Sequence, residues 1–311
     1  MRSRILVLVS LVAVAAVLSV LPFVLSDYNV SLAAQVGVFF IAVLGLDILT
    51  GYTGQISIGH GAFMCIGGYA TAVMSRDHGT NLLVTMLVAF AICFLVGLLV
   101  GLPALRLSGV YLALVTFALA VSVPLLPLKW SNYLGGRNGV QTSHEVSNLW
   151  LYGVAWAASA ILFVLAWLIL RGRVGRAFRA VRDSEIAAVA SGVELPVYKT
   201  LAFGVSAAYA GVAGSLFVLA NNGFAAPDEF GVVLSLKILI GAAVAGLGSL
   251  WGVLAGAAFV GLLPSVSSSV PVIGSSHGQD VVFGAAVILV MLLLPDGFAG
   301  LLARLRRFTR A

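Results

Sequence analysis

The sequence predicts an all-α protein, a polytopic bundle of about ten transmembrane helices with one Gly-rich discontinuous segment and a short cytoplasmic helix. Hydrophobic residues make up 61% of the 311 residues, charged residues only 9%, and the mean hydropathy is +1.12. This composition is typical of polytopic membrane proteins and excludes an ordinary soluble domain. Apolar windows of membrane length also recur along the whole chain. We therefore expect residues 1–311 to form a single membrane domain.

Windows of about 20 apolar residues mark the expected spans. They are residues 5–25, 31–49, 56–74, 82–102, 109–128, 149–170, 201–221, 231–250, 252–270 and 281–294. Arg2 and Arg4 precede the first window, so a cleaved signal peptide is an alternative reading of that segment. Its apolar run is longer than the usual signal-peptide core, which favours a retained span.

Basic residues orient the bundle. With a cytoplasmic N-terminus, most of the 17 Lys and Arg residues fall inside, and only Arg76, Lys129 and Arg137 fall outside, with Lys237 within a span. The positive-inside rule therefore places both termini and the loop of residues 171–198 in the cytoplasm. The net charge of +6 is explained by these juxtamembrane segments and anionic lipid headgroups, so it does not indicate nucleic-acid binding.

Turn-forming and polar residues interrupt the apolar sequence between Gly45 and Val73. Backbone at membrane depth breaks its helix only where protein or a water-filled cavity satisfies the freed groups, and a solute pathway is a common reason for such a break. The expected pathway residues are Asp47, Tyr52, Thr53, Gly54, Gln55, Ser57, His60 and Lys237.

Several of these residues have a structural alternative. His60 either contacts solute or satisfies a neighbouring carbonyl, and Thr53 and Gln55 equally suit the unwound backbone. Asp47 and Lys237 are ionisable groups within spans, where such groups usually face a cavity or each other. We therefore consider three hypotheses: the two residues pair, Lys237 receives a solute carboxylate, or both lie near an interface and reach water.

The cytoplasmic loop contains a predicted helix in residues 175–199. Phe178, Val181 and Ala188 form an apolar stripe, and Gly192 followed by Pro196 indicates a helix stop. Arg179 and Asp183 can pair at helical spacing. Small residues next to Glu185 permit close approach of another protein, so we interpret the segment as a docking helix. Its expected contact residues are Arg176, Arg179, Arg182, Asp183, Glu185, Ala187, Ala188, Gly192 and Pro196.

Several ordered blocks resemble the permeases of the branched-chain amino acid ABC importers. They are GYTGQISIGHGAF from Gly51, GRAFRAVRDSEIAA from Gly175, YKTLAFGVSAAYAGVAGSLF from Tyr198, GLGSLWGVLAGA from Gly246 and ILVMLLLPDGFAG from Ile288. Glu185, Ala187, Ala188 and Gly192 resemble the ATPase-docking loop of bacterial ABC importers. The LivM-type subunit is more similar than the LivH type. The chain departs from the family pattern at Asp47 and Lys237.

This resemblance implies a permease that passes a small polar solute, a branched-chain or other amino acid, through a bacterial cytoplasmic (inner) membrane. Urea, short amides or small organic acids are alternative solutes. The implied partners are a second, LivH-type permease, two cytoplasmic ATPase subunits, an extracytoplasmic solute-binding protein and membrane lipid. The chain has no G-x-x-x-x-G-K-[ST] phosphate loop, so ATP is expected on the partner subunits and no cofactor on this chain.

Two other function classes fit less well. A secondary transporter needs a relay of membrane carboxylates, and Asp47 is the only acid well inside an expected span. An enzyme needs converging nucleophiles, acids or metal ligands, and we expect neither catalytic residues nor a metal site. Gly248, Gly252 and Gly256 recur every four residues, which favours close helix packing. Similar Gly-rich breaks at residues 51–70 and 241–258 suggest an internal duplication.

Overall fold

The computed structural model describes residues 22, 26–105, 107, 109–144, 146–268, 276–294 and 297–300. Most of the first expected span, and with it the signal-peptide alternative, lies outside these residues, as do Arg106 and the arginines beyond residue 300. The described chain is almost entirely helical, in agreement with the predicted all-α class.

The helices and strands follow one another in a simple order. Their bounds are α2 Asp27–Leu46, η1 Asp47–Gly51, α3 His60–His78, α4 Leu82–Ala104, α5 Val110–Ser122, η2 Val123–Leu125, α6 Leu126–Lys129, α7 Ser131–Leu134, η3 Gly136–Asn138, β1 Val140–Gln141, α8 Asn148–Arg171, α9 Arg173–Asp183, α10 Glu185–Ala190, α11 Leu195–Ala220, β2 Phe224–Ala225, η4 Pro227–Phe230, α12 Val232–Ala245, α13 Val253–Ser268 and α14 Ser276–Leu293.

Five helical stretches are long and apolar enough to cross a membrane. Within the described part of the chain they are Asp27–Gly51, Leu82–Pro103, Val110–Lys129, Asn148–Arg171 and Leu195–Ala220. The expected full span at residues 231–250 is wrong, because α12 has only 14 residues. At ~1.5 Å per residue it covers about 21 Å, less than a bilayer core. It ends where Gly246 adopts a left-handed φ of 89°, which a glycine takes without strain.

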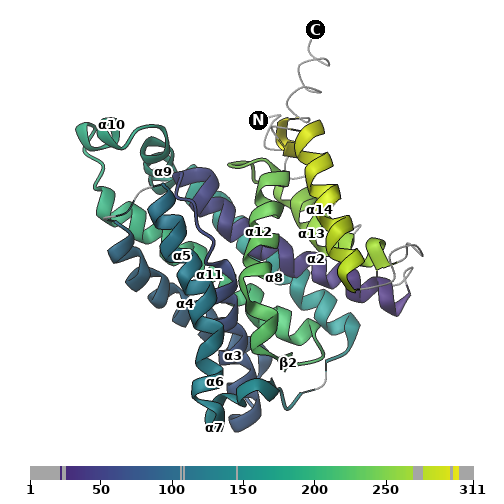
Figure 1. Ribbon diagram of the computed structural model, residues 1–311. Helices are drawn as coiled ribbons and strands as arrows, with labels where there is room; N and C mark the ends of the chain where they lie inside the picture. Colours follow the sequence, from purple (N-terminus) through teal and green to yellow (C-terminus); the bar gives the residue numbers. More distant parts are fainter. Residues whose placement is uncertain are drawn as a thin grey trace.

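Helix α11 forms the centre of the bundle, packed against α2, α3 and α4 (Figure 1). It is apolar around its whole circumference, as expected of a fully buried helix. Its polar groups find partners inside the protein: Tyr209 donates to the carbonyl of Leu162 at 2.7 Å, and Ser215 lies 2.6 Å from Thr71. These bonds satisfy side chains that no water can reach.

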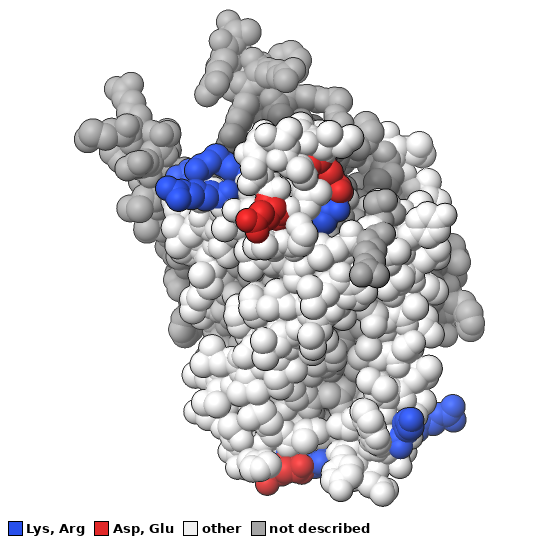
Figure 2. Space-filling view, turned by 90° about the vertical axis from the view of Figure 1, so that its left-hand side faces the viewer, with Lys and Arg blue, Asp and Glu red and all other residues white. Residues whose placement is uncertain are grey.

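In the apolar stretches that contain α4, α5 and α8, only 28% of the residues are buried inside the protein. Leu87, Leu99 and Ile161 are among the large side chains that point outward from them. Such faces are unusual on a soluble protein but are suited to lipid chains. Charged side chains on the face seen in Figure 2 lie near its two ends, and an uncharged band separates them. The described structure therefore agrees with a membrane protein.

The two ends of the bundle differ. Helices α9 and α10 lie at one end, and α6, α7 and the strands lie at the other (Figure 1). The strands pair antiparallel, Val140 with Ala225 and Gln141 with Phe224, which ties the segment before α8 to the segment after α11. With the orientation expected from the basic residues, α9 and α10 mark the cytoplasmic end.

Glycines allow α3 and α11 to touch backbone to backbone. A Cβ at Gly214 would lie 2.7 Å from the carbonyl carbon of Met64, and neither helix can yield locally. We expect Gly214→Val to destabilise the fold by roughly 2 kcal/mol or more. The thermal unfolding temperature in detergent should fall by several degrees. Gly153→Val is the matched control, because a Cβ there meets open space, and an equal loss in both variants would contradict the packing argument.

The four-residue spacing of Gly248, Gly252 and Gly256 does not mark one helix face. Gly248 lies in the turn before α13 with a φ of 82°, so the predicted helical repeat is wrong at this position. Gly256 does serve close packing, because a Cβ there would lie 3.0 Å from both the carbonyl carbon of Gly241 and the Cβ of Ala245 on α12. The α12–turn–α13 unit and the α2–loop–α3 unit both consist of a helix, a Gly-containing break and a second helix.

Candidate functional site

The loop that is expected to face the cytoplasm folds into two helices rather than one. Helix α9 ends at Asp183, Ser184 adopts extended dihedral angles, and its hydroxyl then caps α10 by accepting from the Ala187 N–H at 3.3 Å. The expected stop at Gly192 is confirmed, with φ at 83°. The Val193 N–H donates to the Ala188 carbonyl at 3.0 Å, which completes the helix end.

The apolar stripe of this loop packs inward, as predicted. Phe178, Val181 and Ala188 are at most 3% exposed. The Ala188 side chain, also expected to contact the ATPase, is covered by its own chain in this conformation, and its docking role stays a prediction. The opposite face of α10 carries Ile186, which is 85% exposed, and Val189, which is 54% exposed. Sequence reasoning missed both residues, since it looked for small side chains.

The other expected docking residues lie on the outside of the loop. Arg176, Arg179, Asp183, Ala187, Gly192 and Pro196 are exposed. No ion pair between Arg179 and Asp183 is present among the described residues. Pro196 occupies the first turn of α11, where a missing backbone N–H costs no helical hydrogen bond. Exposed apolar side chains flanked by charge form a surface suited to another protein.

Glu185 has a partner inside this chain. Its Oε1 lies 2.7 Å from Nζ of Lys199, and the Lys199 side chain is only 8% exposed. Lys199 belongs to the first turns of α11, so the ion pair joins the exposed loop to the central helix. Sequence reasoning placed Lys199 in the cytoplasm but did not assign it this role. Glu185 and Lys199 are 14 residues apart and lie on different helices, so helical periodicity does not predict their contact.

The discontinuous segment begins as a π-helical turn, Asp47–Gly51, and continues as loop to α3. Thr53 donates to the Leu49 carbonyl at 2.5 Å, Gln55 donates to Thr53 at 2.9 Å, and Thr50 donates to the Gln55 carbonyl at 3.0 Å. The side chains of Thr53 and Gln55 therefore support the unwound backbone, which was the structural alternative. Tyr52 is 9% exposed. Gly54, with φ at 73°, is exposed.

His60 and Ser57 lie inside the chain. Both are 1% exposed. The His60 Nε2 atom lies 3.4 Å from the Ser206 hydroxyl, while its Nδ1 has no hydrogen-bond partner. The Ser57 hydroxyl accepts from the Gly59 N–H at 3.3 Å. In this conformation neither side chain is accessible to solute.

Asp47 is completely buried, and its hydrogen bond comes from the backbone. The Gly248 N–H donates to its Oδ1 at 2.7 Å, while its Oδ2 has no hydrogen-bond partner. The two Asp47 oxygens show no bond to Lys237 in the described structure, and the pairing of these two residues stays a prediction. Lys237 lies partly exposed on α12. A cationic side chain reaches this cluster from α9, because Arg182 Nη1 donates to the Gly51 carbonyl at 2.5 Å.

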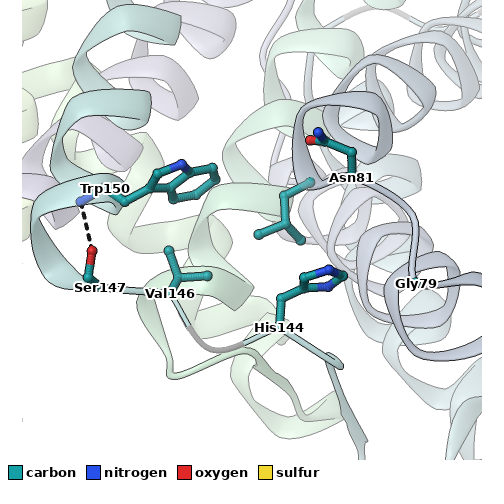
Figure 3. Close-up of a pocket in the computed structure, with 7 residues that line it drawn as sticks. Gly79, Asn81, His144, Val146, Ser147 and Trp150 are labelled. Carbon is teal, nitrogen blue, oxygen red and sulfur yellow. Dashed lines mark hydrogen bonds between the residues drawn. The ribbon is translucent and has the colours of Figure 1, made fainter.

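A cavity of about 640 Å³ opens at the other end of the bundle. Its lining comes from the α3–α4 turn and the segment that leads into α8, and includes Asn81, His144, Ser147 and Trp150 (Figure 3). Trp150 and Leu82 supply apolar surface, and Asn81 and His144 supply polar groups. Its volume is within the range of small-ligand pockets, roughly 300–1,000 Å³. No cluster suited to a metal ion occurs in the part of the chain that the structure describes.

Comparison with known proteins matches residues 28–293 to a family model described as "Branched-chain amino acid transport system / permease component". The chain is 28% identical to the high-affinity branched-chain amino acid transport system permease protein LivM of Salmonella typhimurium, over 89% of this chain and 71% of that protein. It is 24% identical to LivH of Escherichia coli over 84% and 91%. An autoinducer 2 import system permease protein, LsrC of Enterobacter sp., is 31% identical over 64% and 57%. No solved structure matches.

Proposed function

Because the chain belongs to the family of branched-chain amino acid transport permease components, we propose that it is the LivM-type permease of an ATP-driven amino acid importer. It takes solute from an extracytoplasmic binding protein and releases it into the cytoplasm across a bacterial inner membrane. A branched-chain amino acid is the preferred solute, in keeping with the names of LivM and LivH relatives. Similarity to an autoinducer 2 permease makes a wider solute panel worth testing.

The exposed face of α10 is the observation that carries this proposal. Ile186 and Val189 extend away from the bundle on a helix fixed at one end by the Ser184 cap and tied to α11 by the Glu185–Lys199 pair. An amphipathic helix presented in this way suits the groove of a partner. Two ATPase subunits are the proposed partners, one under this chain and one under a LivH-type permease. They bind the ATP that this chain cannot bind without a phosphate loop.

The outer cavity is the proposed point of solute entry. It lies at the end opposite α10, where a binding protein would deliver its cargo, and Trp150 offers an apolar wall for a branched side chain. The buried residues Asp47, Ser57 and His60 line no accessible path in this conformation. Any contact they make with solute requires the inner loops to move.

We expect Trp150→Ala to raise the KM for leucine uptake about tenfold and to leave the maximal rate nearly unchanged. Loss of one well-packed aromatic contact costs roughly 1–2 kcal/mol of binding. Trp130→Ala is the control, because Trp130 is also exposed at this end of the bundle, between α6 and α7, but does not line the cavity. An unchanged KM in the Trp150 variant would remove the cavity from the entry path.

Single cysteines test the proposed topology. The native Cys65 and Cys93 are buried, so they contribute little background. Ser191→Cys, beyond α10, should react with a membrane-impermeant maleimide only after the cells are opened. Asn132→Cys, in α7, should react in intact cells. Both positions are exposed; Ser191 ends α10 through its backbone N–H, which a cysteine retains. Labelling of both from the same side would contradict the orientation.

The function itself is tested by co-expression of this chain with a LivH-type permease and its ATPase subunits. The expected result is a complex that retains both ATPases and, in proteoliposomes with the binding protein, accumulates radiolabelled leucine only when ATP is present. Urea and acetamide serve as alternative solutes. ATP-independent accumulation driven by an ion gradient would identify a secondary transporter instead.

A further inference from the structure

Arg182 joins the docking loop to the inner end of the bundle. It lies on α9, two residues before the Ser184 cap of α10. Its Nη1 donates to the Gly51 carbonyl at 2.5 Å. That carbonyl belongs to the π-helical turn, where the regular helical hydrogen bonds are displaced. π-Helical turns inside α-helices frequently occur at functional sites.

The Arg182 side chain also fills the space beside two glycines. A Cβ at Gly248 would lie 2.7 Å from its Nη1 and 3.1 Å from the Gly51 carbonyl oxygen. A Cβ at Gly54 would lie 3.5 Å from its Cγ. Gly54 belongs to the α2–α3 loop and Gly248 to the α12–α13 turn. The Arg182 side chain therefore lies beside both Gly-containing breaks: its guanidinium bonds to Gly51 and lies next to Gly248, and its Cγ lies next to Gly54.

The Tyr52 hydroxyl interacts with the backbone of Leu250, which joins the first break to the second. The Gly248 N–H donates to Asp47 Oδ1 at 2.7 Å, and the second carboxylate oxygen, Oδ2, is buried without a hydrogen-bond partner. A buried carboxylate oxygen with no partner costs free energy in this conformation. The contact between α2 and the α12–α13 turn therefore forms in this conformation but leaves one buried acceptor without a hydrogen bond. Such a contact is expected of a segment that has a second stable conformation.

We propose that Arg182 is a positioning residue that keeps the cytoplasmic gate closed, by holding the α2–α3 loop and the α12–α13 turn together. Displacement of α10 by the ATPase moves α9, withdraws the guanidinium from Gly51 and lets Gly248 separate from Asp47. The inner ends of α2 and α12 then part and solute is released. This inference rests on the proposed function, because it takes the movement of α10 from the partner.

The test measures a leak in the assembled complex without ATP. Proteoliposomes containing this chain with its permease and ATPase partners are loaded with radiolabelled leucine, and efflux is followed. Arg182→Met keeps the length of the side chain but removes its donors. We expect efflux at least tenfold faster than wild type, because loss of a charge-assisted hydrogen bond shifts a closed–open equilibrium by that order. Arg173→Ala, also on α9 and exposed, should remain tight.

Two further variants separate a gate from a merely structural role. Arg182→Lys keeps the charge and one donor direction, so its leak should fall between wild type and Arg182→Met. Gly248→Ala places a Cβ against the guanidinium and strains a turn that needs a positive φ, so it should leak although Arg182 is intact. If the Arg182→Met complex does not assemble, the leak of the Gly248→Ala complex is the measurement that tests the gate. For each variant, retention of the ATPases by the purified complex shows that the fold is intact.

The outcomes for gate and function are distinct. Wild-type impermeability in assembled Arg182→Met and Gly248→Ala complexes, alongside ATP-driven uptake by wild type, would overturn the gate and leave the proposed function standing. Failure of wild type to accumulate leucine with ATP would overturn the function first. A leak in Arg173→Ala equal to that in Arg182→Met would also overturn the gate, because loss of any α9 charge would then suffice.

Discussion

The Ile186→Asp variant is expected to fold, insert and lose ATP-driven uptake. Ile186 is 85% exposed on α10, so an aspartate there stays in water and leaves the bundle intact. In the complex the carboxylate would be desolvated against the apolar groove of the ATPase. Central apolar contacts of this kind are worth about 2 kcal/mol or more, so uptake should fall at least about thirtyfold.

Two further measurements show whether the Ile186→Asp variant loses uptake through loss of ATPase binding. Retention of the ATPases on the affinity-purified permease should fall in parallel with uptake, while the thermal unfolding temperature of the isolated permease stays constant. Ile186→Leu is the matched control, since it preserves size and apolar character, and should behave like wild type. Full coupling in Ile186→Asp would mean that α10 is not the docking element, whatever the ATPase contacts instead.

Periodicity and composition were enough for the class of fold but not for the lengths of its helices. The apolar windows correspond well to α2, α4, α8 and α11, whose sequences run without interruption. They fail at residues 231–250, where apolar side chains continue past Ala245 although the helix does not. Hydropathy averages over a window, whereas a turn depends on the dihedral angles of Gly246 and Gly248. A single glycine in an apolar run does not reveal which angle it adopts.

The site was predicted less completely, because its residues meet only after folding. The loop around Gly51 and the helix around Glu185 could be located as local patterns. The bonds from Arg182 to Gly51 and from Gly248 to Asp47 join segments far apart in the chain. No helical or strand period relates them. Sequence reasoning also favoured small residues for docking, and so selected Ala188, which faces inward, rather than Ile186.

The Glu185–Lys199 pair changes how the proposed docking loop must be tested. On sequence grounds, Glu185→Arg is a way to disrupt docking, but in the structure it would place an arginine beside the buried ammonium of Lys199. Like charges so close would destabilise the loop itself. Loss of coupling in such a variant would therefore report on folding as much as on the partner, and the pair needs its own experiment.

The two members of this pair should respond unequally to removal. Glu185→Ala leaves the Lys199 ammonium, 8% exposed, without its counter-charge, whereas Lys199→Met leaves a carboxylate that is 47% exposed and returns to water. Breaking a fully buried pair costs roughly 3–5 kcal/mol, and partial exposure of Glu185 reduces this to about 2–3 kcal/mol for Glu185→Ala. Lys199→Met should cost under about 1 kcal/mol of stability, because the methionine side chain fills the space of the buried lysine side chain with apolar atoms.

The double variant Glu185→Ala with Lys199→Met provides the decisive comparison. It has neither an unpaired charge nor a void along the lysine stem, so its thermal unfolding temperature should return close to that of Lys199→Met. Equal losses in the two single variants, or a double variant as unstable as Glu185→Ala, would mean that Lys199 finds water or another acceptor. ATPase retention by the double variant then separates stability from docking. A folded double variant that still binds the ATPase would assign Glu185 to holding α10 in place and leave Ile186 and Val189 as the contact.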